Sequence, residues 1–192
     1  MQSSNASQSR RGLVSRARAL VAPIAIFASL AGTRVAAAQE AGIMLGAAAP
    51  GAAVESLDGR AMNLSEYVGK GPVVLEFWAT WCPVCKELEA PLAAARRKYG
   101  DRVTFVSVGV HDNQTPDRQK KYATRNRIGG KFVFDRKGEA VAAYKVPHTS
   151  YLVAIDAKGT VVYTGVGPDQ DIDAAVASAL MPDGAMGKMS PR

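Results

Sequence analysis

The two cysteines of the W-C-P-V-C segment at residues 81–85 are the side chains of this 192-residue chain best suited to covalent chemistry. The segment follows a β-rich run, residues 73–78, and opens a stretch with helical spacing of apolar residues, which places Cys82 at a helix N-terminus. Unpaired backbone N–H groups and the helix dipole favour a thiolate there, and a thiolate is the species that attacks disulfides. The spacing therefore predicts a redox-active pair: Cys82 attacks, Cys85 resolves the mixed disulfide, and the pair closes as Cys82–Cys85.

The C-x-x-C spacing is also compatible with two other kinds of site, a zinc site and a structural disulfide. A zinc site needs two further nitrogen or sulfur ligands, and the chain offers no other cysteine and only two histidines, His111 and His148. A purely structural disulfide is the second. A redox pair is favoured because the cysteines come between a strand and a helix, and because Pro83 suits the first helical position.

The N-terminal segment explains most of the chain's basic charge. The whole sequence carries 24 Lys and Arg against 17 Asp and Glu, a net charge of +7, which invites a nucleic-acid hypothesis. However, residues 1–38 hold five arginines and no acid, and they read as a basic region, an apolar run and an A-x-A cleavage site. This pattern predicts a signal peptide over 1–38, whose removal would leave a net charge of +2 and no case for nucleic acid.

Export places the cysteine pair in an oxidising compartment, the periplasm or cell envelope, where a thiol pair can act chemically. The apolar run of the leader is shorter than the roughly 20 residues that span a bilayer. Membrane attachment is therefore expected only if the leader is not cleaved.

The remaining chain reads as one α/β domain over residues 54–180, between a flexible lead-in at 39–53 and a disordered tail at 181–192. A D-G turn inside 57–64 predicts an N-terminal β-hairpin. Strands are expected at 73–78, 103–110, 151–155 and 160–165, and helices at 83–99, 115–127 and 171–180. This alternation predicts a central sheet flanked by helices on both faces.

The segment V-V-L-E-F-W-A-T-W-C-P-V-C-K, residues 73–86, resembles the active-site strand and helix of thioredoxin-fold proteins, above all the exported TlpA/ResA type of disulfide reductase. L-D-G at 57–59, L-S at 64–65, I-D-x-x-G at 155–159 and a final G-V-G extend the resemblance over roughly residues 46–180. It implies a thioredoxin-like fold with a mixed sheet and an N-terminal hairpin extension.

The resemblance also assigns roles to residues around the cysteines. Glu76 matches the buried acid that thioredoxins keep behind the pair, where a carboxylate can take the proton of Cys85. Trp81 and Pro83, together with Thr149 and Ser150, are expected to contact substrate. The alternative for Glu76 is a structural one, in which its carboxylate reaches solvent or a lysine and takes no part in proton transfer.

One position departs from the family, which has a cis-proline directly before the third main strand. Counting back from I-D-A-K-G, that position falls on Ser150, and the alternative register places the proline at Pro147 with three inserted residues. The Ser150 register is favoured. A non-proline cis bond costs about 2.5–4 kcal/mol, so the Thr149–Ser150 bond is expected to be trans and the substrate groove altered.

The segment V-P-H-T-S-Y-L-V-A-I-D-A-K-G also resembles the histidine loop of Sco-type copper chaperones, which share the fold. Cys82, Cys85 and His148 form the alternative copper site, since two thiolates and an imidazole suit copper. Against it, those chaperones have three residues between their cysteines rather than two. The alternative without copper is that His148 is a polar loop residue near the site.

The sequence hypothesis is an exported thiol–disulfide oxidoreductase that reduces disulfide-containing exported proteins and is re-reduced by a membrane thiol electron donor. It needs no cofactor, with copper as the alternative. A thiol peroxidase is a weaker third hypothesis, because Ala79 stands where the threonine of a T-x-x-C arrangement would be.

Overall fold

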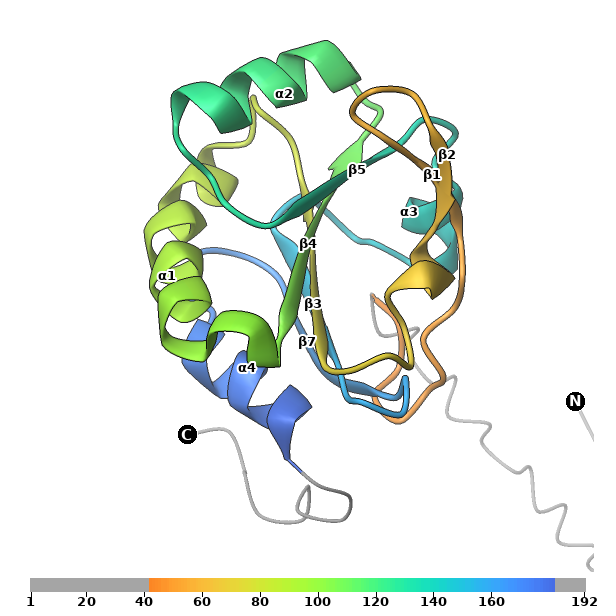
Figure 1. Ribbon diagram of the computed structural model, residues 1–192, viewed down its shortest axis with the longest axis vertical. Helices are drawn as coiled ribbons and strands as arrows, with labels where there is room; N and C mark the ends of the chain where they lie inside the picture. The colour runs from red at the N-terminus through yellow and green to blue at the C-terminus, as the bar shows by residue number, and fades with distance from the viewer. Residues whose placement is uncertain (1–41, 182–192) are drawn as a thin grey trace, which may run out of the picture. The chain divides into compact units, whose positions relative to one another are not determined.

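Seven strands form one mixed sheet in the computed structural model, which describes residues 42–181 (Figure 1). Their spatial order is β2-β1-β5-β4-β3-β6-β7. The strands are β1 (Ala53–Ser56), β2 (Ala61–Asn63), β3 (Val73–Trp78), β4 (Thr104–Val110), β5 (Lys131–Asp135), β6 (Tyr151–Ile155) and β7 (Val161–Gly165). The helices are α1 (Pro83–Tyr99), α2 (Pro116–Arg125), α3 (Glu139–Ala143) and α4 (Ile172–Leu180), with single 3-10 turns at Leu64–Glu66 and Gly100–Arg102.

Strand β3 lies at the centre of the sheet and carries the redox segment at its carboxyl end. It pairs in parallel with β4 and antiparallel with β6, and all six of its residues are buried. Alternate side chains of a strand point to opposite faces, so Phe77 and Val74 enter different core clusters. Because both faces of β3 are buried, its sequence is almost entirely apolar.

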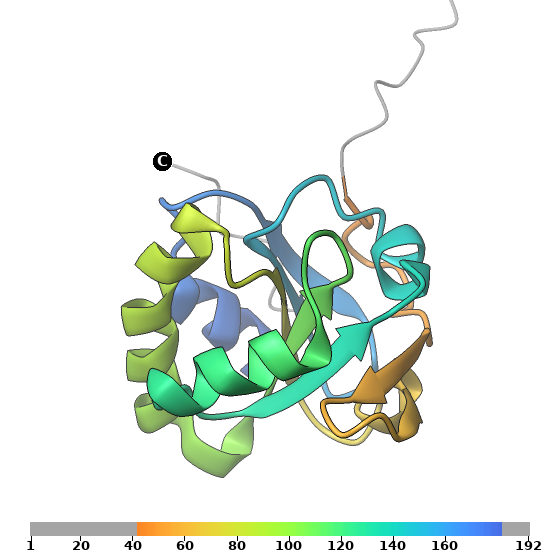
Figure 2. The same cartoon turned by 90° about the horizontal axis from the view of Figure 1, so that it is seen from above.

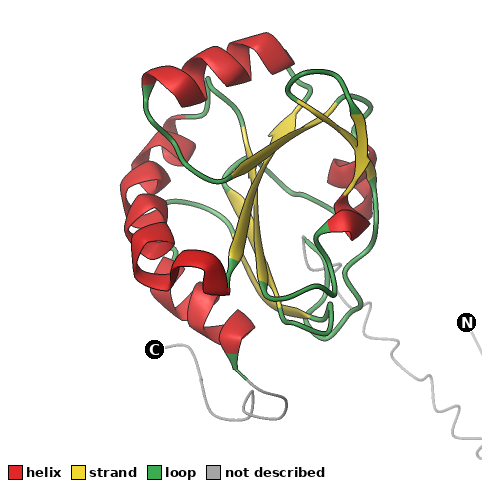
Figure 3. Cartoon of the chain, in the orientation of Figure 1, coloured by secondary structure: helices red, strands yellow, loops and turns green. Residues whose placement is uncertain are grey.

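Helices cover both faces of the sheet, as the sequence predicts. Helices α1, α2 and α4 lie on one face, while α3 and the turn at Leu64–Glu66 lie on the other (Figures 1–3). The parallel steps from β3 to β4 and from β4 to β5 run in the same direction across the sheet. Because such crossovers are right-handed, their helices, α1 and α2, fall on the same side.

The segment 39–53 is predicted to be a flexible lead-in, but over residues 42–53 it packs against the domain. Ile43 and Ala52 are buried, and the amides of Gly46 and Ala49 donate hydrogen bonds to the carbonyls of Val161 and Gly159. A segment composed mostly of Ala and Gly can still pair through its backbone with the edge of a sheet, and composition alone does not reveal this. The described domain therefore begins before residue 54.

Two element boundaries also differ, and one helix is additional. The hairpin strands lie at Ala53–Ser56 and Ala61–Asn63, on either side of the expected D-G turn, so the first strand precedes residue 57. Helix α2 ends at Arg125 rather than Arg127, because Arg127 has a left-handed backbone with φ of 53°. Helix α3 was not expected, since its five residues are too few to show helical periodicity.

The predicted signal peptide, with its cleavage site after residue 38, lies outside the described residues, as does all of the predicted tail except Met181. Across residues 42–181, no helix combines the length and the hydropathy that crossing a bilayer requires.

Candidate active site

The two cysteines form a disulfide at the start of helix α1. Their sulfur atoms are 2.11 Å apart and their Cα atoms 5.3 Å apart. Cys82 is the N-cap residue, and its Sγ accepts the backbone N–H of Cys85 at 3.0 Å. Pro83 occupies the first helical position, where no partner for an N–H is needed. The helix N-terminus therefore directs a backbone donor at the Cys82 sulfur, which is what stabilises a thiolate.

The loop between β3 and α1 is held against the loop before α2. The amide N–H of Thr80 donates to Oε1 of the buried Gln114 at 2.6 Å. The indole Nε1–H of Trp81 donates to the Asp112 carbonyl at 2.8 Å, while 42% of this residue's surface stays exposed. Cys82 itself is only 3% exposed, so Trp81 is the large apolar surface that an approaching partner meets beside the disulfide.

Glu76 lies on β3 and is buried on the face covered by α1. The Ser107 hydroxyl donates to Glu76 Oε2 at 3.3 Å, and Arg96 Nη2 lies 4.0 Å from the same oxygen. Burial raises the pKa of Glu76 to about 7, and the nearby Arg96 guanidinium and the Ser107 hydrogen bond only partly oppose this rise. A second carboxylate, Glu89, raises the pKa further. A carboxyl group with a pKa of about 7 can both accept and return a proton near neutral pH.

A narrow cavity connects Glu76 with the second cysteine. Its walls include Glu76, Cys85, Trp78 and Ser107, and its volume is about 10 Å³. That volume is close to the smallest that holds one water molecule. Glu76 and the resolving Cys85 therefore line the same small cavity, which has room for about one water molecule.

The segment before β6 meets the carboxyl end of β3 from the other side. Ser150 directly precedes β6, and Tyr151 pairs with Phe77 in the antiparallel register. The Ser150 N–H donates to the Phe77 carbonyl at 2.8 Å, and the backbone of Ser150 is left-handed, with φ of 68°. A proline has no N–H and a φ near −65°, so it could hold neither feature. Ser150 therefore occupies the position directly before β6, and Pro147 lies three residues earlier. That Ser150 corresponds to the family's proline stays a prediction from the sequence.

Thr149, the other contact residue expected in this loop, is half-buried. Pro147, the alternative proline position, is also half-buried, and His148, the alternative copper ligand, is exposed. Within residues 42–181, no three His, Cys, Asp or Glu side chains are grouped so that they could hold a metal ion. The copper site of Cys82, Cys85 and His148 stays a prediction from the sequence.

Three polar residues of the site were not expected from the sequence. Ser107 pairs with Glu76 in the β3–β4 register, and a single serine inside an apolar strand was the available signal. Arg96 reads as part of a solvated R-R-K run, yet it is largely buried beside Glu76. Gln114 lies in a polar loop, where nothing in the sequence distinguishes a buried glutamine from an exposed one.

Comparison with known proteins agrees with this geometry. The Redoxin family pattern matches residues 44–180. The thiol-disulfide oxidoreductase ResA of Geobacillus thermodenitrificans is 32% identical over 140 residues, which cover 70% of this chain and 77% of the relative. The thioredoxin-like protein YneN of Bacillus subtilis is 28% identical over 130 residues, covering 67% and 75%.

Solved structures give the same result for the fold. A Chlorobium tepidum protein assigned as the thiol:disulfide interchange protein DsbE superposes with a TM-score of 0.63 at 26% identity. The match covers 72% of this chain and 99% of that protein. The predicted thioredoxin-like α/β fold, with its mixed sheet and N-terminal hairpin, is confirmed.

Proposed function

This chain belongs to the Redoxin family and is a thiol–disulfide oxidoreductase, and we propose that it reduces disulfides of exported partner proteins. The observation that carries the proposal is the Cys82–Cys85 disulfide at the start of α1, with a buried carboxyl group behind it. The structure holds the oxidised state, which is the product of the proposed reaction and the form that a reductant must reopen.

The first step is attack by the Cys82 thiolate on one sulfur of the partner's disulfide. A bond forms between Cys82 and that sulfur, the partner's S–S bond breaks, and its second sulfur leaves as a thiolate. The Cys85 N–H and the α1 dipole stabilise the attacking thiolate at the Cys82 position. Trp81 and the Thr149–Ser150 backbone are the surfaces proposed to hold the partner in place.

The second step releases the partner. Glu76, as a carboxylate, accepts the Cys85 thiol proton through the shared cavity. The Cys85 thiolate then attacks Cys82, the Cys82–Cys85 bond forms, and the partner's first sulfur leaves and takes up a proton. The partner gains two electrons as a dithiol, and the chain loses two. A membrane dithiol donor returns both electrons, so the cycle uses no cofactor.

Export is the second part of the proposal. It rests on the arginine-rich and apolar pattern of residues 1–38, and on an oxidising compartment being where partner disulfides form. Retention of the leader would make the protein a membrane-attached enzyme of the same compartment.

The direction of electron flow is tested by two reactions run side by side. The reduced protein is mixed with a disulfide-containing substrate protein, and the oxidised protein with the same substrate in its reduced form, and thiols are counted over time. We expect the first reaction to open one substrate disulfide per Cys82–Cys85 pair formed, and to be the faster of the two. Rapid transfer of the disulfide to the reduced substrate, with little reduction in the first reaction, would show an oxidase instead.

A further inference from the structure

The loop between β3 and α1, residues 79–82, is referred to below as the redox loop. A basic hollow of about 550 Å³ lies between this loop and α2. Thr80 and Lys86, which bracket the cysteine pair in the sequence, form one wall, and the α2 residues Arg118, Lys121, Tyr122 and Arg125 form the other. We refer to this site as the basic hollow. It is separate from the small cavity that Glu76 and Cys85 line, because the two share no lining residue.

The cations of the basic hollow are Lys86, Arg118, Lys121 and Arg125. They form no ion pair with any carboxylate in the part of the chain that the structure describes. Arg118 instead donates to the Asn113 carbonyl, and Arg125 lies over the Tyr122 ring at 5.7 Å.

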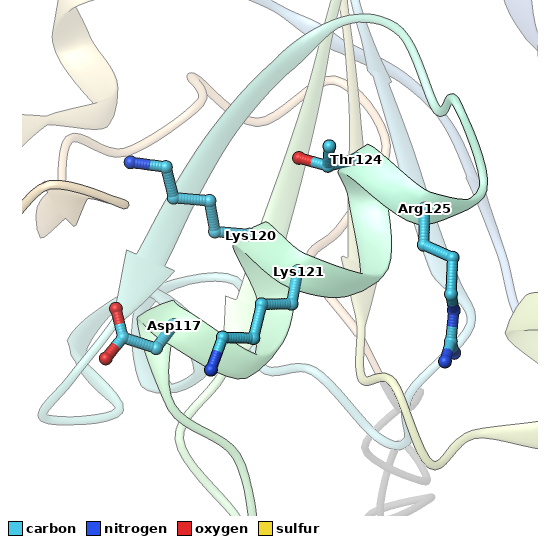
Figure 4. A pocket seen from close by; sticks show the side chains of 5 residues that line it. All are labelled: Asp117, Lys120, Lys121, Thr124 and Arg125. Atoms are coloured by element: carbon cyan, nitrogen blue, oxygen red, sulfur yellow. The ribbon is translucent and has the colours of Figure 1, made fainter.

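Another lysine of α2 behaves differently. Lys120 is paired with Asp58. Figure 4 shows Lys121 and Arg125 extending to one side of α2 and Lys120 to another. The side of α2 that faces the redox loop therefore carries the cations left unneutralised, with Asp117 as the acidic side chain among them.

Direct contacts hold α2 in place relative to the cysteines. The Thr80–Gln114 and Trp81–Asp112 hydrogen bonds fix the redox loop to the chain that leads into α2. The Tyr122 hydroxyl donates to Glu89 Oε1 of α1 at 2.6 Å. The position of the positive charge relative to Cys82 is therefore set by the fold.

We propose that the basic hollow binds an acidic segment of the substrate protein, next to the disulfide that Cys82 attacks. This inference rests on the proposed reduction of partner proteins and adds the chemistry of the partner. From Arg118 to Arg125 the helix rises by about 10 Å, which matches about three residues of extended chain. That spacing suits several acidic side chains in a row better than one small anion. Opposite charges at this range attract an approaching partner and set its orientation.

The test uses two disulfide-bonded peptides that differ only in having glutamates or glutamines beside the disulfide. The reduced protein is assayed with each, and kcat/KM is measured at low and high salt. We expect the acidic peptide to react about tenfold faster at low salt, within the range that electrostatic steering produces. Most of this preference should vanish near 1 M salt, where the Debye length is about 3 Å.

Two double variants locate the effect. Lys86→Gln with Lys121→Gln should lower the acidic preference to about threefold or less and leave the neutral peptide unaffected. Lys70→Gln with Lys131→Gln removes the same charge at exposed positions before β3 and at the start of β5, the opposite end of these parallel strands from the cysteines. This control should keep the preference of the wild type.

The outcomes separate this inference from the function beneath it. Equal rates with both peptides at every salt concentration would overturn the acidic partner and leave the reductase intact. Reduction of neither peptide would contradict the proposed function, and the inference with it. Cation-dependent reduction of glutathione disulfide, without any preference between the peptides, would show that the hollow serves a small anion and that the proposal is wrong.

Discussion

Two segments meet at the carboxyl end of β3, and they reach it by different means. The start of α1 uses local features: an N-cap cysteine, a proline at the first helical position and a sulfur that accepts an amide three residues on. The segment before β6 depends on distant parts of the chain. Ser150 bonds Phe77 through its amide, its carbonyl accepts from Gln170, and its backbone is left-handed.

This difference separates chemistry from recognition. The α1 side holds the reacting sulfurs and the buried carboxyl group, so changes there should alter rates first. The Ser150 side holds a backbone geometry that proline cannot adopt, so changes there should alter folding and substrate contact first. The predictions below test this division, beginning with the largest effect.

Replacing Cys82 by serine should remove disulfide reduction almost entirely. Loss of the attacking thiolate leaves no nucleophile in reach of the partner, so we expect kcat/KM to fall by at least about three orders of magnitude. Stopped-flow reduction of a disulfide substrate measures the loss. Pro147→Ala, in the loop before β6, is the matched change on the other side and should keep most activity. A loss of the same size in Pro147→Ala would break the division.

Glu76→Gln should slow release of the partner about a hundredfold, the lower range for loss of a general base. Formation of the mixed disulfide should be nearly unchanged, because Glu76 shares a cavity with Cys85 and not with the attacking side. Quenched-flow trapping separates the two steps. Glu87→Gln, at an exposed position on α1, is the control and should leave both steps as in the wild type.

The same substitution should change the pH dependence of stability. Because burial raises the pKa of Glu76 from 4.5 to about 7, the folded state keeps its proton in this window while the unfolded state has released it. The contribution of Glu76 to the free energy of unfolding therefore falls as the pH rises from about 4.5 to about 7. Glu76→Gln should stabilise the protein by about 3 kcal/mol at pH 8 and by little at pH 4, as measured by urea unfolding. A stability difference between the two proteins that does not grow across this window would show that the pKa of Glu76 is not raised in the folded state.

Ser150→Pro should destabilise the fold by about 2–3 kcal/mol, because the Phe77 carbonyl loses its partner and the φ of 68° becomes inaccessible. Ser150→Gly, which adopts a left-handed backbone freely, should change stability by less than about 1 kcal/mol. Thermal unfolding distinguishes them. A Ser150→Pro protein that is as stable as the wild type and more active would mean that the loop accepts the family's cis-proline, contrary to this structure.

Trp81→Phe gives the smallest expected change. It removes the indole hydrogen bond to the Asp112 carbonyl, an exposed bond worth about 0.5 kcal/mol, and keeps an aromatic ring beside the disulfide. The stability change should be near the limit of a urea melt, and KM should rise by no more than about twofold. A tenfold rise in KM would show that the loop anchor, rather than the ring, holds the substrate.

The start of α1 could be predicted from the sequence and the segment before β6 only in part, because the first depends on residues close in the sequence and the second on distant ones. The positions of Cys82, Pro83 and Cys85 at the start of α1 are predicted correctly, because a helix start depends on neighbours within one turn. Ser150 could be placed beside β6 by counting from I-D-A-K-G, but its left-handed backbone could not be foreseen. That conformation is fixed by bonds to Phe77 and Gln170, which are distant in the sequence.

The same reasoning applies to the polar residues around Glu76. That Glu76 is buried follows from its place in an apolar strand, whereas its partners depend on the β3–β4 register and on how α1 packs. Arg96 belongs to an R-R-K run at a helix end, where such side chains usually face solvent, and only the tertiary packing decides that Arg96 turns inward.

The attack of Cys82 on a partner disulfide is tested most directly by trapping the intermediate. A Cys85→Ser protein cannot resolve the mixed disulfide, so intact-mass spectrometry after mixing with a disulfide substrate should show a covalent adduct at Cys82. Cys82→Ser should give far less adduct under the same conditions, since the amide donor at the start of α1 is directed at the Cys82 sulfur and not at the Cys85 sulfur. Equal or greater trapping through Cys85 would reverse the two roles, and no adduct with either variant would contradict the proposed reduction of partner disulfides.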